Sequence, residues 1–109
     1  MKFSKIILAG SLVMGIGFSS AASALDGGKL FSSPTKGGCS ACHGKDAKTP
    51  LMPMYPKLAG QNSAYIVQQM KDIKSGARSN GMTAAMKGIM HMVNDEEIKA
   101  IADYLAGLK

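Results

Sequence analysis

Apolar residues recur every three or four positions along residues 63–75, which is the spacing of one face of a helix. Asn62 or Ser63 can cap the beginning of this stretch, because each side chain can accept a hydrogen bond from an unpaired backbone N–H. Gly76, a residue type that often ends helices, follows it. The pattern predicts a helix over Ser63–Ser75 whose apolar face carries Ile66, Met70 and Ile73.

Two further stretches have helical patterns. Asn94 can serve as an N-cap, and Glu97 three residues later gives nearly the spacing of a capping box. The apolar positions of the helix that follows are Ile98, Ile101, Ala102 and Leu105. A short amphipathic helix is also expected over Gly27–Ser32, with Asp26 near its start.

Residues 44–60 show no such periodicity. They contain Pro50, Pro53 and Pro56, so we expect an extended, turning loop here. The chain contains no long alternation of apolar and polar positions, so no strand is predicted. The sequence therefore predicts an all-α fold in a single domain.

The first 24 residues have the pattern of a secretory signal peptide. Lys2 and Lys5 precede an apolar run, and the small residues Ala22-Ser23-Ala24 follow it. The run is shorter than the ~20 apolar residues of a transmembrane helix, so cleavage after Ala24 is expected rather than a stable membrane anchor. Export to the periplasm would lower the net charge of the chain from +6 to +4, because two lysines are lost.

The exported domain, residues 25–109, has few large side chains with which to build a core. Its aromatic residues are Phe31, Tyr55, Tyr65 and Tyr104. Domains of this size are marginally stable unless a disulfide, a metal or a bound group adds to the burial of apolar surface. The two cysteines of the chain are therefore the first candidates for such a role.

These cysteines form the motif Cys39-Ser40-Ala41-Cys42-His43. In an exported protein, C-x-x-C-H is the attachment signature of a c-type haem. Residues three apart share one face of a helical turn, so both thiols can reach one edge of a porphyrin while His43 approaches the iron. The motif predicts one covalently bound haem c, held by Cys39 and Cys42, with His43 as an axial ligand.

Three other uses of the cysteines are weaker. A disulfide between residues three apart would close a very short loop and stabilise the fold little. A thioredoxin-like redox pair belongs in a longer chain in which strands alternate with helices. A zinc site needs further ligands at paired spacing, and His91 is the only other histidine.

Residues 26–109 resemble a class I monohaem cytochrome c, in particular the small bacterial periplasmic branch that also occurs as single domains of dihaem cytochromes. The resemblance depends on the haem motif, on Tyr55-Pro56-Lys57-Leu58-Ala59-Gly60-Gln61 and on Asn94-Asp95-Glu96-Glu97-Ile98. It implies a small cytochrome c fold of three to five helices around one haem. It also implies that the first helix crosses the last, with Gly27 and Phe31 meeting Ile101 and Tyr104.

The resemblance also implies roles for two residues near the iron. Pro53 matches the proline whose backbone carbonyl accepts a hydrogen bond from the axial histidine. Met86, eight residues before Asn94, matches the methionine that is the sixth iron ligand, and a soft neutral thioether suits that position. Met82 is the second choice, and Met90, Met92 and His91 stay open as further alternatives.

The function that follows is a soluble one-electron carrier rather than an enzyme. Lysines near the haem-bearing segments would steer such a carrier, expected as a monomer, toward redox proteins with acidic docking surfaces, such as a terminal oxidase or a periplasmic reductase or dehydrogenase. Nucleic acid is not expected as a partner, because export removes the opportunity. Two alternatives remain: a five-coordinate haem sensor or weak peroxidase, and a fixed electron-transfer subunit of a membrane oxidase or dehydrogenase complex.

Overall fold

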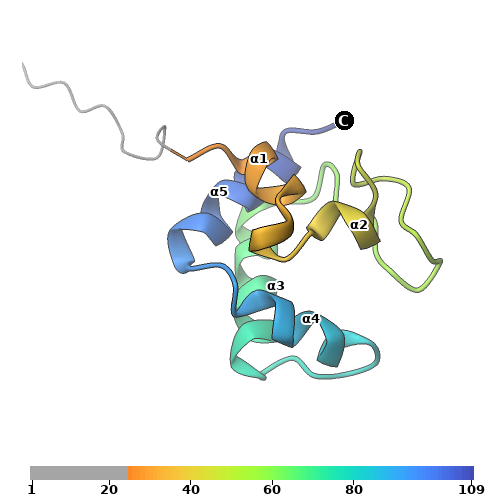
Figure 1. Cartoon of the computed structure of the whole chain (residues 1–109), viewed down its shortest axis with the longest axis vertical. Helices are drawn as coiled ribbons and strands as arrows, with labels where there is room; N and C mark the ends of the chain where they lie inside the picture. The colour runs from red at the N-terminus through yellow and green to blue at the C-terminus, as the bar shows by residue number, and fades with distance from the viewer. Residues whose placement is uncertain (1–24) are drawn as a thin grey trace, which may run out of the picture.

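The computed structural model describes residues 25–109, which form five α-helices and one short 3-10 helix (Figure 1). In chain order these are α1 (Gly27–Ser32), η2 (Pro34–Lys36), α2 (Cys39–His43), α3 (Ser63–Ser75), α4 (Thr83–Met90) and α5 (Asp95–Ala106). Residues 25–109 contain no strand, so the predicted all-α fold is confirmed. None of these helices has the length and apolar character that crossing a membrane requires. The signal peptide predicted over residues 1–24 lies outside the described residues.

The predicted starts of α3 and α5 are confirmed by their caps. The side chain of Asn62 accepts a hydrogen bond from Tyr65 N at 3.1 Å. At α5, Asn94 Oδ1 accepts from Glu97 N at 2.8 Å, and Glu97 Oε1 accepts from Asn94 N at 2.9 Å. This reciprocal pair is a complete capping box, which satisfies two backbone N–H groups that would otherwise have no partner in the helix.

Helix α4 is an element that the sequence pattern did not predict. It has only eight residues, contains Gly88, and begins without a side-chain hydrogen bond at its cap. Such a short segment has little intrinsic helical stability in water, so its helical form depends on packing against α3. The Nζ of Lys74, in the last turn of α3, donates a hydrogen bond to the carbonyl oxygen of Val93, just beyond α4.

The predicted crossing of the first and last helices is present. A Cβ atom on Gly27 would lie 2.1 Å from the carbonyl oxygen of Ala100 and 2.7 Å from Tyr104 Cβ, so only glycine permits this approach. Four residues on, the ring of Phe31 lies with its centroid 5.9 Å from that of Tyr104. The crossing brings the beginning of α1 against the middle of α5.

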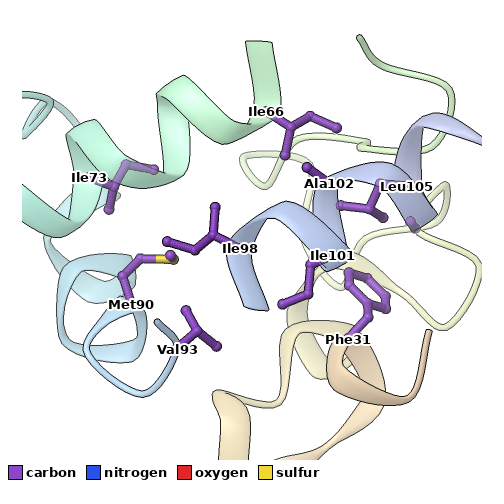
Figure 2. Packing of buried hydrophobic residues seen from close by; sticks show 10 residues of the cluster. Phe31, Ile66, Ile73, Met90, Val93, Ile98, Ile101, Ala102 and Leu105 are labelled. Atoms are coloured by element: carbon purple, nitrogen blue, oxygen red, sulfur yellow. The ribbon is translucent and has the colours of Figure 1, made fainter. Parts of the chain in front are cut away.

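The hydrophobic core lies between α3 and α5 and extends to α1 and α4 (Figure 2). Phe31 and Met90 are almost completely buried at the two ends of this cluster. The other labelled core residues in Figure 2 are Ile66, Ile73, Val93, Ile98, Ile101, Ala102 and Leu105. The core thus contains every apolar residue predicted for the face of α5 and two of the three predicted for α3, since Met70 is only partly buried.

Glu97 connects the start of α5 to the 3-10 helix. Its Oε2 lies 2.9 Å from the Nζ of Lys36, and the Glu97 residue is buried. The hydrogen bond from Lys36, followed by that from the Asn94 backbone, lowers the pKa of the Glu97 carboxyl below its ordinary value. The folded state therefore favours the charged form of this group.

We predict that Asn94→Ala lowers the free energy of unfolding by about 1 kcal/mol, the usual effect of removing an N-cap acceptor. The Glu97 N–H would then lose its partner. Urea denaturation followed by circular dichroism measures the change. Asn94→Ser keeps a capping oxygen and should stay close to the parent, and equal stability of the alanine variant and the parent would contradict this role.

The lowered pKa of Glu97 predicts a stability difference that depends on pH. A carboxyl with a depressed pKa in the folded state stabilises the fold above its unfolded pKa of about 4.3, and this contribution is lost as the pH falls through the folded value. Parent and Glu97→Gln should therefore differ in urea midpoint at neutral pH and converge in acid. Glu96→Gln, which removes an exposed carboxylate from the same turn, is the matched control. A difference that persists unchanged in acid would refute this electrostatic origin.

Candidate functional site

A cavity of about 470 Å³ lies between the haem motif, the proline-containing loop, α3 and α4. Ile66, Ile73, Ile101 and Leu105 belong both to the hydrophobic core and to the wall of this cavity. The apolar core of the domain is therefore open on one side, toward a space large enough for a bound group.

Helix α2 is a single turn that places the two cysteine thiols at this cavity. Gly38 and Gly44 flank α2, both with positive φ. Cys39 and Cys42 form no disulfide, and both line the cavity, as the helical spacing predicted. Burial raises the pKa of the Cys39 thiol above its ordinary value. Two thiols on one wall can form two thioether bonds to one edge of a porphyrin.

His43 is buried next to these thiols and also lines the cavity. Its Nδ1 lies 2.9 Å from the backbone carbonyl oxygen of Pro56. A carbonyl oxygen can only accept, so Nδ1 carries a proton and donates it, and in the neutral tautomer this leaves the lone pair on Nε2. This hydrogen bond thus prepares Nε2 to bind a metal ion.

The assignment of this carbonyl to Pro53 is wrong, because the structure places Pro56 at His43. Pro53 lies in an exposed turn that is closed by a hydrogen bond from Tyr55 N to Met52 O at 3.0 Å.

Two backbone hydrogen bonds from the proline-containing loop to residues in or just after the haem motif determine which proline lies at His43. Leu51 N donates to Cys42 O at 2.8 Å, and Leu58 N donates to Ala47 O at 2.8 Å. Pro56 lies two residues before the second of these anchors. Ala47 itself is fully buried and has a φ of 59°, which is unusual for a residue other than glycine. A strained, buried residue of this kind marks a loop whose path is set by its tertiary contacts.

Of the methionines considered as sixth ligand, Met82, Met86 and Met90 line the cavity. Met82 caps the start of α4 and is 43% exposed, whereas Met90 is 2% exposed within the core. Met86 lies between them, one helical turn from each, and is partly buried. His91 and Met92 are exposed and are not among the residues that line the cavity.

The residues on the cavity wall fit a c-type haem. They supply two free thiols, an imidazole with its Nδ1 already bonded, and thioether sulfurs from a separate helix, within a largely apolar space. The charged side chains that line this cavity are Lys57 and Arg78, and no carboxylate of residues 25–109 lies on its wall. Positive charge of this kind suits the two carboxylates of a haem.

Arg78 is a cavity residue to which no motif in the sequence pointed. Its Nη1 donates a hydrogen bond to Gln69 Oε1 at 3.0 Å, and both side chains line the cavity. Arg78 follows the end of α3, where its backbone N–H bonds to Asp72 O at 3.0 Å. Its place depends on how the chain turns after α3, so spacing along the sequence carries no signal for it.

Comparisons with known proteins agree with this site. The sequence model of the family "Cytochrome c" matches residues 24–109. The chain is 42% identical to cytochrome c4 of Pseudomonas aeruginosa over 71 residues, which are 65% of this chain and 33% of that protein. It is 30% identical to cytochrome c-553 of Nitratidesulfovibrio vulgaris over 105 residues, 95% of this chain and 98% of that protein.

A comparison with solved structures also finds a cytochrome c. The crystal structure of reduced cytochrome c4 from Pseudomonas stutzeri superposes with a TM-score of 0.70 and 32% identity, covering 87% of this chain and 53% of that one. The chain thus spans from a third to about half of the cytochrome c4 relatives that it matches, but nearly all of cytochrome c-553.

We predict that Cys39→Ala or Cys42→Ala impairs covalent haem attachment and lowers the yield of folded protein, because the bound group completes the core. Haem staining of denaturing gels measures attachment, and circular dichroism measures folding. Ser40→Ala, which leaves both thiols in place, should behave like the parent. Normal folding of a cysteine variant without haem would refute the argument that the group completes the core.

Proposed function

The chain belongs to the cytochrome c family, and from this premise we propose that it is a periplasmic one-electron carrier with His43 and Met86 as the two axial ligands of its haem. The haem iron, when bound, supplies a one-electron exchange between the ferrous and ferric states. Cys39 and Cys42 hold one haem c covalently, so the group cannot be lost to dilution outside the cytoplasm. The single observation that carries the proposal is the cavity on which both thiols, His43 and Met86 meet.

The hydrogen bond from His43 Nδ1 to Pro56 O supports a fixed orientation of the imidazole in both oxidation states. A fixed ligand keeps the reorganisation on electron exchange small. The thioether of Met86 is a soft, neutral ligand, which favours the reduced metal and raises the potential. If His43 and Met86 both bound the iron, no coordination position would be left for a substrate, as expected for a carrier and not for an enzyme.

The surface charge supports electron exchange with acidic partners. The exposed lysines closest in sequence to the cavity-lining segments are Lys45, Lys48, Lys57, Lys71 and Lys87. Lys36 and Lys74 have internal partners, Glu97 and the Val93 carbonyl, so they contribute to the fold. Of the exposed carboxylates in residues 25–109, Asp95, Glu96 and Asp103 lie on α5 and Asp26 lies before α1, while Asp46 lies among these lysines, where its Oδ1 accepts hydrogen bonds from Lys48 N and Thr49 N. We propose that the partners are redox proteins whose docking surfaces carry carboxylates, in keeping with steering by opposite charge.

The location in the periplasm is the part of this proposal that depends on residues 1–24. These residues have the pattern of a cleaved signal peptide, and covalent haem attachment through C-x-x-C-H is typical of exported proteins.

We predict that Met86→Ala keeps the covalent haem but loses the sulfur-to-iron charge-transfer band of the oxidised protein. The reduction potential should fall by a sizeable fraction of the about 0.8 V range over which axial ligands set haem potentials. The reduced variant should also bind carbon monoxide, which the parent should not. Absorption spectroscopy and redox titration measure these changes.

Met82→Ala is the matched control, since Met82 lies one turn away on the same cavity. It should keep the band and exclude carbon monoxide. If the band survives in Met86→Ala and disappears in Met82→Ala, the ligand assignment is wrong. If the parent itself binds carbon monoxide readily, the protein is a sensor or weak peroxidase with an open iron.

A further inference from the structure

Gly37 and Ile89 form a close contact between the segment that carries the thiols and the helix that carries Met86. A Cβ atom on Gly37 would lie 2.4 Å from Ile89 Cγ2 and 3.6 Å from the Ile89 carbonyl oxygen. Gly37 precedes Cys39 by two residues, and Ile89 follows Met86 by three on the same helix. The two sides of the cavity therefore approach each other at Gly37, where the contact leaves no room for a side chain.

Both partners in this contact are held from other directions. On the Gly37 side, Lys36 N and Gly38 N both donate to Ser33 O, at 3.1 and 3.0 Å, and the Lys36 side chain pairs with Glu97. These bonds fix the backbone on each side of Gly37.

On the Ile89 side, the end of α4 is fixed in a similar way. Met92 N donates to Ile89 O at 2.9 Å, Met90 is buried in the core, and Lys74 bonds to the Val93 carbonyl. The Cγ2 of Ile89 is attached directly to Cβ, and a β-branched side chain in a helix has one strongly preferred rotamer. Rotation of the side chain is therefore a poor way to relieve a clash.

We propose that Gly37 is a positioning residue for the sixth iron ligand. Its contact with Ile89 sets how closely α4 approaches the haem motif, and so holds Met86 at the distance that ligation needs. This inference rests on the proposed function, because it requires Met86 to be the ligand.

The displacement that an alanine at position 37 would force on α4 is large enough to disturb ligation by Met86. Ordinary van der Waals contact begins at 3.4 Å, and the Cβ of an alanine at position 37 would lie 2.4 Å from Ile89 Cγ2, so one side must move by about 1 Å. Ligand constellations tolerate displacements of only about 0.5 Å. Because α4 is a short helix, a shift at Ile89 carries Met86 with it.

The test compares Gly37→Ala with Gly38→Ala in the holoprotein. Gly38 also has a positive φ, 57°, but a Cβ there would meet nothing closer than 4.0 Å. Gly37→Ala should lose the sulfur-to-iron charge-transfer band and bind carbon monoxide when reduced, whereas Gly38→Ala should keep the band and exclude carbon monoxide. A band of full intensity in Gly37→Ala overturns the proposal.

A double variant separates the contact from backbone strain, since Gly37 has a φ of 101° and alanine is strained there. Ile89→Ala removes Cγ2 but leaves Cβ, which lies 3.8 Å from the position of the new methyl group. Gly37→Ala/Ile89→Ala should therefore regain the band, because the clash is relieved while the strain persists. Failure to regain it would mean that strain, and not the contact, displaces the ligand, and would overturn the proposal.

If Gly37→Ala yields no holoprotein, a comparison of Ile89→Ala with the double variant still tests the positioning role of Gly37. That variant opens a gap beside α4 and should bind carbon monoxide more readily than the parent, and adding Gly37→Ala should fill the gap and reduce the binding. Equal or greater binding by the double variant contradicts the proposal. Failure of the proposed function is distinguishable, because the parent would then lack the charge-transfer band, or the band would survive in Met86→Ala.

Discussion

The hydrogen bond between His43 Nδ1 and the Pro56 carbonyl joins two segments that the rest of the site depends on. One is the single helical turn α2, which carries both thiols, and the other is the proline-containing loop that returns to the cavity. An imidazole that is buried and bonded at Nδ1 can present only Nε2 to the cavity. The geometry of the site therefore follows from the path of a loop as much as from the haem motif itself.

Several side chains of the apolar core also form the wall of the cavity. Phe31, Ile66, Ile101 and Leu105 pack within the core and also face the space where the haem belongs. A chain with so few aromatic residues gains from burying the faces of a bound porphyrin against such side chains, because burial of apolar surface is the main favourable term in folding. Folding and cofactor retention are then one process, so a change in either affects both.

The sequence was most informative where local chemistry decides the structure. The helix bounds at Ser63–Ser75 and the capping box at Asn94 and Glu97 depend on neighbouring residues, and both are confirmed. The path of residues 44–60 instead depends on hydrogen bonds to Ala47 and Cys42, so the accepting carbonyl was assigned to Pro53 although it belongs to Pro56. Helix α4 was missed for a similar reason, since a helix of eight residues without a side-chain cap is stabilised by packing rather than by its own sequence.

The crossing of α1 and α5 at Gly27 and Tyr104 has a consequence for how such a domain can be reused. It brings the first helix of the fold against the last, and the points where a chain would enter and leave the domain lie on the same side (Figure 1). Domains with neighbouring ends can be duplicated in tandem or inserted into other chains without disturbing their interior. The fold can therefore act as a module. Because the haem motif is only the five residues 39–43, a copy of the domain in another protein would keep its own site of covalent haem attachment.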